Sequence, residues 1–156
     1  GQVEGDLTMV KPKLTGVDDN GLPFVVTAAA ARQESRGSDT VLLEQVTAEL
    51  TLKGGGTMQI TAGKGTVDTK RRLMDVSGGI RFHSSEGYDA RTVSAKADLA
   101  AGKLHGEKPI EADGRFGHLT AQRFALDRDS RQLLFEGNVK MTINRSDVTP
   151  TLRLRR

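Results

Sequence analysis

Hydrophobic and polar residues alternate over much of this chain, and the alternation is clearest between residues 121 and 143. Two runs with a period of two flank a polar loop at residues 127–132. In the second run the hydrophobic residues share one parity: Leu133, Phe135, Val139, Met141 and Ile143. A period of two is typical of a strand with one apolar face. The stretch therefore predicts a long β-hairpin whose second arm runs on to residue 143.

The hairpin pattern recurs earlier in the chain. Three alanines are each followed sixteen residues later by a glycine, in the pairs Ala62 and Gly78, Ala90 and Gly106, and Ala121 and Gly137. An aspartate closes the first arm of each unit, at Asp68, Asp98 and Asp127, which are 30 and 29 residues apart. A looser copy starts at Ala28. Repeats of this length indicate a supersecondary unit that stacks on its copies, so we expect stacked hairpins.

The parity of the hydrophobic positions changes just after each of these alanines. In the first unit Ile60 and Ala62 are even, whereas Gly65 and Val67 are odd; in the second unit Val93 continues the odd series. A slip of one residue turns the apolar face outward unless a bulge or corner absorbs it. Bulges in register would bend the stacked strands along one line. We therefore predict an all-β fold, a twisted antiparallel β-jellyroll or folded-over sandwich built from repeated β-hairpins.

Prolines and turn residues set the limits of this sheet. Pro12 cannot donate to a strand ladder, so residues 1–16 predict an edge strand at best. Residues 18–21 (DDNG) predict a tight turn, and they lack the spaced acidic ligands of a calcium loop. Pro109 predicts a bend or an edge in the second unit. Helix is plausible only at residues 28–36 and 94–101, and the repeat favours strand for the second segment.

Composition narrows the class of protein. The chain has 156 residues, 36% of them hydrophobic and 4% aromatic, with a net charge of +3. We expect one domain over residues 1–150, followed by a basic tail at residues 151–156. No basic run is interleaved with aromatic residues, which disfavours nucleic-acid binding. The absence of cysteine excludes disulfides and thiolate zinc sites, and no apolar run approaches the about 18 residues of a membrane span.

No set of residues forms a recognisable catalytic constellation. The three histidines, His83, His105 and His118, fall at strand ends or beside turns and lack the spacing of a helical metal pair. We interpret the repeated aspartates as turn formers, because an Asp side chain at a turn bonds nearby backbone N–H groups, rather than as paired catalytic acids. The sequence thus predicts no enzyme, no cofactor and no metal site. What remains is the apolar lining, which is either an ordinary core or a lipid-binding trough, and periodicity alone favours the core.

The repeated unit resembles the OstA-like repeat of lipopolysaccharide-transport proteins. That unit is an alanine, a bulge, a strand ending in Asp, a polar loop, and a return strand with a glycine between apolar positions. Within that group, four stretches resemble the LptC family: residues 42–52 (LLEQVTAELTL), 60–65 (ITAGKG), 87–88 (GY) and 97–102 (ADLAAG). The likeness covers about residues 5–143.

The resemblance implies a non-enzymatic role in outer membrane biogenesis. It implies a periplasmic domain that receives lipopolysaccharide from an inner-membrane ABC transporter and passes it to a periplasmic bridge protein of the same fold. Such a domain is normally anchored to the inner membrane by an N-terminal helix, which we expect upstream of Gly1. The alternative is a structural β-repeat scaffold with a dry core.

An acyl chain needs a continuous apolar surface, and thirteen hydrophobic residues are candidates to line it. They are Leu50, Leu52, Met58, Ile60, Val76, Ile80, Phe82, Phe124, Leu133, Phe135, Val139, Met141 and Ile143. Assembly with partners would use open sheet edges, since an added strand satisfies the unpaired backbone groups of an edge. We expect residues 138–144 to form the edge for the downstream bridge protein, and the N-terminal edge to face the transporter.

Overall fold

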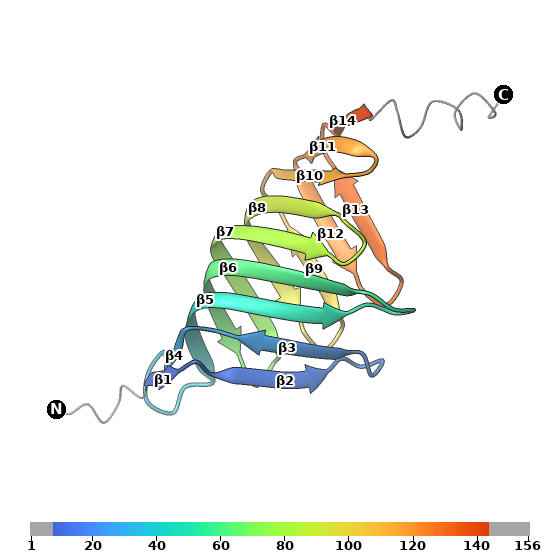
Figure 1. Ribbon diagram of the computed structural model, residues 1–156. Helices are drawn as coiled ribbons and strands as arrows, with labels where there is room; N and C mark the ends of the chain where they lie inside the picture. The colour runs from blue at the N-terminus through green and yellow to red at the C-terminus, as the bar shows by residue number, and fades with distance from the viewer. Residues whose placement is uncertain (1–7, 144–156) are drawn as a thin grey trace.

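The computed structural model describes residues 8–143, and this range contains strands and no helix. The first seven strands are β1 (Thr8–Val10), β2 (Lys13–Val17), β3 (Pro23–Thr27), β4 (Ala30–Gln33), β5 (Thr40–Thr51), β6 (Thr57–Asp68) and β7 (Leu73–Ser84). The others are β8 (Asp89–Asp98), β9 (Lys103–Gly106), β10 (Ile110–Gly114), β11 (Gly117–Ala121), β12 (Arg123–Asp127), β13 (Gln132–Glu136) and β14 (Lys140–Ile143). All pair antiparallel in one 14-stranded sheet (Figure 1), which confirms the predicted all-β class.

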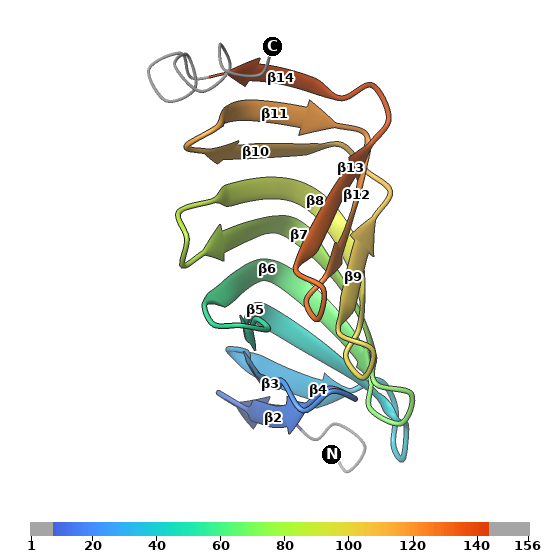
Figure 2. The same cartoon turned by 90° about the vertical axis from the view of Figure 1, so that its right-hand side faces the viewer.

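The sheet is folded into two leaves, because the long strands change neighbours halfway along. The first half of β5 pairs with β4, and its second half pairs with β3. The first half of β8 pairs with β10, and its second half pairs with β9. Leaf A thus contains β2, β3, β10, β11 and β14, leaf B contains β1, β4, β9, β12 and β13, and β5–β8 contribute half of their length to each. Figure 2 shows β14, β11 and β10 in one leaf and β13, β12 and β9 in the other.

A line of irregular residues forms the corner between the leaves. Gln45 and the pair Gly78 and Gly79 have positive φ angles of 53°, 80° and 86°. The pairing of β6 with β7 shifts register between Ala62 and Lys64. A Cβ atom on Gly63 would lie 2.8 Å from the carbonyl oxygen of Gly78, so the two strands approach through glycine. The predicted change of parity after Ala62 is confirmed, and it marks this corner.

The third unit confirms the same rule, whereas the second departs from it. In the third unit β11 ends at Ala121 and β12 begins at Arg123, with Gln122 between them. In the second unit Thr92 is still buried and Val93 is 57% exposed, so the parity changes later than Ala90. The prediction for Val93 was wrong because Thr92 can face inward: its hydroxyl group donates a hydrogen bond of 2.9 Å to the carbonyl oxygen of Pro109.

The return arm of the third hairpin is not one strand. Gly137 and Asn138, with φ angles of 83° and 48°, separate β13 from β14. β13 pairs with β12 in leaf B, and β14 pairs with β11 in leaf A. The prediction of a continuous strand from 133 to 143 was wrong because this arm crosses the corner, as its neighbours do.

Two predictions about strand limits are confirmed and one about helix is not. Pro12 lies between β1 and β2, which pair only with β4 and β3 respectively, as expected of an edge. Pro109 lies between β9 and β10, at the corner. The helix considered at residues 28–36 is wrong, since Ala30–Gln33 is strand β4 and pairs with β1 and β5.

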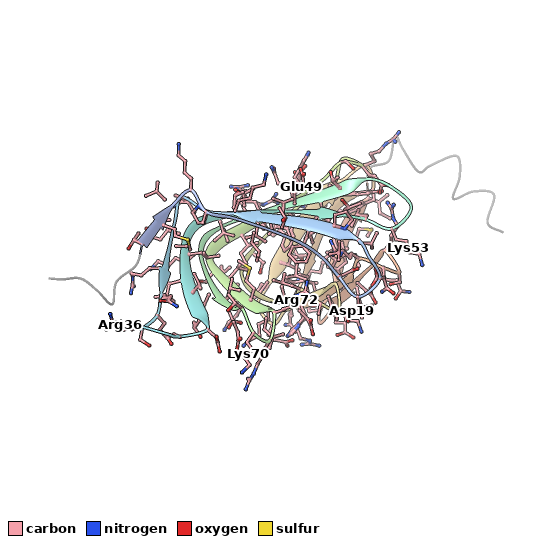
Figure 3. The ribbon with its side chains drawn as sticks, turned by 90° about the horizontal axis from the view of Figure 1, so that it is seen from below. Asp19, Arg36, Glu49, Lys53, Lys70 and Arg72 are labelled. Atoms are coloured by element: carbon pink, nitrogen blue, oxygen red, sulfur yellow. The ribbon has the colours of Figure 1, made fainter. Side chains whose placement is uncertain are left out.

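The hydrophobic core lies between the leaves. Among residues 8–143, twenty-five hydrophobic residues are buried there, including Phe24, Ile80, Phe82, Leu119 and Phe124. Seen from below (Figure 3), side chains fill the space between the leaves, while Glu49 points outward from leaf A and Lys70 lies on a turn of leaf B. The fold therefore has a hinge-like corner on one side and facing rows of turns on the other.

Candidate functional site

The largest apolar hollow between the leaves lies toward the C-terminal end of the sheet and is called here the C-terminal cavity. It has a volume of about 460 Å³. Its lining comes from both leaves: Met58, Phe82, Tyr88, Asp89, Ala90, Ile110, Ala112, Phe116, Leu119, Phe124, Leu126, Arg131, Leu133, Phe135 and Met141. Concave, mostly apolar spaces of this size are typical of small-molecule sites. Thirteen of these fifteen residues are uncharged, and two, Asp89 and Arg131, carry a charge. The space therefore suits a hydrocarbon ligand better than a polar one.

Aromatic pairs form part of the wall of the C-terminal cavity. Phe82 of leaf A meets Phe124 of leaf B edge to face, with ring centroids 5.5 Å apart. Tyr88 and Phe116 pack against each other at 5.9 Å. Edge-to-face pairing is a favourable geometry for aromatic rings, and the contact between Phe82 and Phe124 fixes the separation of the leaves at the inner end of the cavity.

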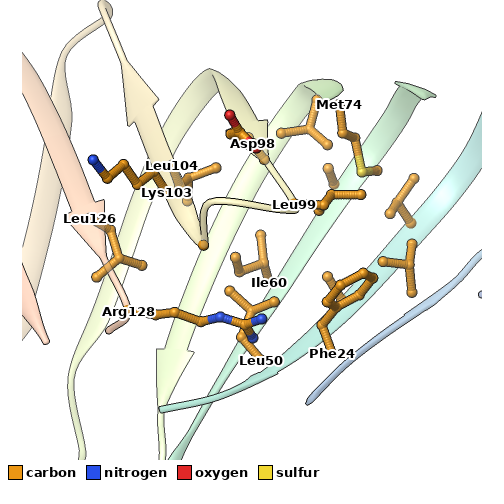
Figure 4. A pocket seen from close by; sticks show the side chains of 17 residues that line it. Phe24, Leu50, Ile60, Met74, Asp98, Leu99, Lys103, Leu104, Leu126 and Arg128 are labelled. Carbon is orange, nitrogen blue, oxygen red and sulfur yellow. The ribbon is translucent and has the colours of Figure 1, made fainter. Parts of the chain in front are cut away.

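The middle of the interior is much narrower. A space of about 50 Å³, called here the central space, has Phe24, Leu50, Ile60, Leu126 and Arg128 among its lining residues (Figure 4). This is room for a water molecule or two and not for an acyl chain. Toward the N-terminal end a third hollow, the N-terminal pocket, has a volume of about 250 Å³ and is lined in part by Leu14, Phe24 and Leu99.

Arg128 closes the central space by reaching from leaf B to leaf A. Its side chain is 2% exposed and its Nε donates to Oδ2 of Asp18 at 3.0 Å. The two Nη atoms donate to the carbonyl oxygens of Pro23 at 3.0 Å and Leu22 at 2.8 Å. The guanidinium carbon also lies 5.7 Å from the ring centroid of Phe24. A buried guanidinium with an ion partner and carbonyl acceptors is a satisfied charge, as a buried charge requires.

The carboxylate of Asp18 is held in its charged form. Burial would raise its pKa, but the backbone N–H groups of Leu22 and Asn20 and the guanidinium of Arg128 together keep the pKa below its ordinary value. Both N–H groups donate to Oδ1 at 2.9 Å. Asp18 thus forms the predicted turn and also carries one half of a buried ion pair.

Two other arginines bridge the leaves from corresponding positions of the repeats. Arg72 and Arg131 each stand four residues after the aspartate of their unit, with φ angles of 60° and 58°. Arg72 donates to the carbonyl oxygen of Val17 at 2.7 Å. Arg131 donates to the carbonyl oxygens of Lys53 at 3.0 Å and Gly55 at 2.6 Å, and it pairs with Glu86. The turn conformation aims both side chains across the opening between the leaves.

The thirteen predicted lining residues fall into three groups. Six line the C-terminal cavity: Met58, Phe82, Phe124, Leu133, Phe135 and Met141. Three line the central space: Leu50, Ile60 and Val76. The other four, Leu52, Ile80, Val139 and Ile143, line neither; the first two are buried core residues and the last two are exposed. The structure brings the six residues of the first group together around one cavity. Ligand binding by the thirteen residues stays a prediction.

The aspartates of the repeats have the turn-forming role predicted for them. Oδ1 of Asp68 accepts hydrogen bonds from two backbone N–H groups of its turn, at 3.1 and 2.9 Å. Asp98 accepts one from Ala101 at 2.9 Å, and Asp127 accepts one from Asp129 at 3.0 Å. These carboxylates are thus used to shape turns.

Each of the three histidines lies one residue from the end of a strand, as predicted, and on its outer face. Nδ1 of His83 lies 2.7 Å from Oδ1 of Asp89, and Nδ1 of His118 lies 2.7 Å from Oδ1 of Asp113. Arg91, 2.6 Å from the other oxygen of Asp113, and His118 together hold the pKa of that carboxyl below its ordinary value. These are cross-strand pairs on leaf A, and within residues 8–143 no group of three His, Cys, Asp or Glu residues could hold a metal ion.

Sequence reasoning missed the pair of Asp18 and Arg128 because each lies in a polar turn. The available signal was weak: residues 18–21 and 127–131 place opposite charges at the ends of two turns, and nothing in the alternation says that they meet. The contact depends on how the two leaves face each other.

Comparison with known proteins gives one family match. The family model described as "Lipopolysaccharide-assembly, LptC-related" matches residues 2–144 of the chain. A search of curated proteins found no match. Across residues 8–143, the structure offers no helix with the length and apolar character needed to span a membrane.

Proposed function

We propose that this chain, which belongs to the LptC-related family of lipopolysaccharide-assembly proteins, binds the acyl chains of lipopolysaccharide in its C-terminal cavity. Family membership gives the chain a role in lipopolysaccharide transport. In our proposal the domain works in the periplasm without catalysis, anchored to the inner membrane by a preceding helix. It receives the lipid from an inner-membrane ABC transporter and passes it to a periplasmic bridge protein.

The observation that carries this proposal is the C-terminal cavity itself. It combines a volume of about 460 Å³ with a lining of aliphatic and aromatic side chains from both leaves. Removing hydrocarbon from water contributes roughly 25 cal/mol for each Å² of apolar surface buried. Such contacts are distributed and non-directional, so a ligand held by them can leave without breaking a single strong bond. That property suits a carrier that must release its ligand.

A photo-crosslinking pair on β13 tests the proposal. Phe135 lines the C-terminal cavity, whereas its neighbour Leu134 is 54% exposed and does not line it. A photo-reactive residue at Phe135, in cells that make lipopolysaccharide, is expected to give a lipopolysaccharide adduct. The same residue at Leu134 is the matched control and is expected to give none. Folded protein with no adduct at Phe135, or with equal adducts at both positions, would contradict acyl-chain binding in the cavity.

The handover step rests on the edges of the sheet. β14 pairs with β11 and stands at one end of the strand order, and β1 stands at the other. β13 pairs only with β12, so both leaves end in a strand with one free edge on the side of the C-terminal cavity. An incoming strand can continue a sheet at such an edge. In our proposal the bridge protein adds to β14 and the transporter meets the N-terminal edge.

The second candidate function, a structural scaffold with a dry core, is favoured by the central space. That part of the interior is packed to a residual volume of about 50 Å³ and holds a buried ion pair. A scaffold needs no room between its leaves. The crosslinking pair on β13 separates the two candidates, because a scaffold gives no lipid adduct at Phe135.

A further inference from the structure

Arg128 is the least exposed charged residue of those that the structure describes, and it does not line the C-terminal cavity proposed for the acyl chains. The latch is defined here as the contacts of Arg128 with Asp18, Leu22 and Pro23. Two further contacts accompany it across the same gap. The backbone N–H of Asp19 donates to the carbonyl oxygen of Ala100 at 2.7 Å, and the side chain of Asn20 donates to Asp129 at 2.5 Å.

The two leaves are joined differently on their two sides. On one side the strands run continuously from leaf to leaf through the corner, where Gly78 and Gly79 adopt left-handed conformations. On the other side the leaves meet through turns, and the bridges there, among them those of Arg72, Arg128 and Arg131, are hydrogen bonds and ion pairs. Separation of the leaves therefore needs only non-covalent bridges to break, with small residues at the corner to absorb the rotation.

The three hollows of the interior lie in series. The N-terminal pocket and the central space share Phe24 and Leu99 as walls, and the central space and the C-terminal cavity share Leu126. The narrowest of the three is the one that Arg128 lines. Two guanidinium groups contact Phe24, those of Arg72 and Arg128, each 5.7 Å from its ring centroid. The same contacts that join the leaves thus also close the passage between the wider hollows.

We infer that the latch is a gate that decides how far an acyl chain enters the interior. With the latch closed, only the C-terminal cavity has room for hydrocarbon. When Arg128 leaves Asp18 and the carbonyl oxygens of leaf A, the leaves separate there and the three hollows join into one apolar groove. The inference rests on the proposed function, since it concerns the path of the same acyl chains. It adds a closed state, in which the ligand is confined to the end of the domain nearest β13 and β14.

A reversible bridge across the latch tests the inference, and the natural absence of cysteine makes the labelling specific. The variant N20C/D129C places one thiol on each side of the gap, at side chains that touch in the native protein. A short bis-thiosulfonate reagent links the thiols, and a reducing agent removes the link. Lipopolysaccharide adducts are then measured with a photo-reactive residue at Leu50, in the central space, or at Met141, in the C-terminal cavity. The matched control is D75C/K96C, which carries the same link between paired, exposed positions within leaf B, outside both hollows.

The expected result is loss of the adduct at Leu50 in the linked protein, its return on reduction, and an unchanged adduct at Met141. The link in D75C/K96C is expected to change neither position. An adduct at Leu50 that persists in the linked protein, or that is absent in linked and reduced protein alike, would overturn the latch while leaving the C-terminal cavity intact. Absence of the adduct at Met141 in every form would instead reject the proposed function.

A releasing variant gives an independent second readout. In D18N/R128M the asparagine retains an oxygen for the N–H groups of Asn20 and Leu22, and the methionine removes the charge that bridges the leaves. The adduct at Leu50 is expected to rise relative to the adduct at Met141. An unchanged ratio in folded protein would show that Arg128 does not gate the interior.

Discussion

Arg128 and Asp18, which are 110 residues apart in the sequence, form an ion pair whose side chains are 2% and 0% exposed. Removing one partner of a buried pair leaves an uncompensated charge, which costs about 3–5 kcal/mol. We expect Arg128→Ala to lower the free energy of unfolding by this amount in urea titrations. The control is Arg71→Ala, whose side chain is 77% exposed and 3.9 Å from Asp68. Such surface changes stay within about 0.5 kcal/mol, so equal losses in the two variants would contradict the role given to Arg128.

Acid should weaken the fold through Asp18. Its pKa is lower in the folded protein than its ordinary value, so the charged form stabilises the fold. This contribution is present above the pKa of the unfolded chain, about 3.9, and is lost as the pH falls through the lower pKa of the folded state. Urea midpoints should therefore drop below about pH 4, and Asp18→Asn should flatten that drop. A drop of the same slope in Asp18→Asn would exclude Asp18 as its source.

Salt separates this effect from that of Asp113, whose pKa is also lowered, first by Arg91 and then by His118. The side chain of Asp113 is 45% exposed, so added salt should screen its ion pairs. The effect of Asp113→Asn on the acid slope should shrink in high salt. That of Asp18→Asn should persist, because its partner is buried.

The close approach of Gly63 and Gly78 should make the corner intolerant of a side chain. A Cβ atom on Gly63 would meet the backbone oxygen of Gly78 at 2.8 Å, so the strands must move apart. Overpacking of this kind costs about 1–3 kcal/mol. We expect Gly63→Ala to lower the thermal midpoint and to broaden the NMR signals of residues next to the corner. Gly79→Ala is the control for crowding. Its new Cβ meets no atom within 4 Å, so any loss of stability there comes from the left-handed φ angle of 86° alone.

Filling the C-terminal cavity should block the ligand without unfolding the domain. Ala112 is buried and lines the cavity, which has room for a larger side chain. Ala112→Phe is expected to remove most of the lipopolysaccharide adduct at Phe135, at little change in the urea midpoint. Thr120→Phe, on the adjacent strand at a position paired with the outward-facing Glu111, is the control and should leave the adduct in place. If both variants reduce the adduct equally, the cavity is not where the acyl chain binds.

The edge at β14 should be the contact for the bridge protein. A photo-reactive residue at Thr142, which pairs with His118 of β11, is expected to crosslink to that partner in cells. The control position is Gln59, which lies in β6 between β5 and β7 and therefore away from any edge. Crosslinks from Gln59 but not from Thr142 would place the contact on a face of the sheet and not on its edge.

The fold was predictable from the sequence because alternation and turn chemistry are local. The period of two predicted the strands, and the aspartates predicted the turns. The parity change after Ala62 and Ala121 predicted the corner. The break at Gly137 and Asn138 was not predictable in the same way. Two residues inserted at a corner preserve parity, so the apolar pattern reads through it as one strand.

The site was predictable only in part, for a different reason. Alternation identifies which side chains face inward, and six of the thirteen candidates, among them Phe82 and Phe135, do line the C-terminal cavity. It does not say where inward-facing side chains touch and where they leave space. That depends on the separation of the leaves, which Arg128 and Asp18 set through contacts between turns distant in sequence. The same limit explains Leu52 and Ile80, which face inward but are packed in the core.

The corner carries a consequence for how such a chain can change in length. The outgoing arms of the first and third units cross it with a slip of one residue after an alanine, that of the second unit slips later than Ala90, and the return arm β7 crosses it with the two residues Gly78 and Gly79. Deleting a single residue within an arm would turn its inward-facing side chains outward. Deleting a whole hairpin would instead join two arms in which the inward-facing side chains stay inward. Viable insertions and deletions should therefore come as complete hairpins or fall within the turns. The sheet should lengthen or shorten by two strands at a time.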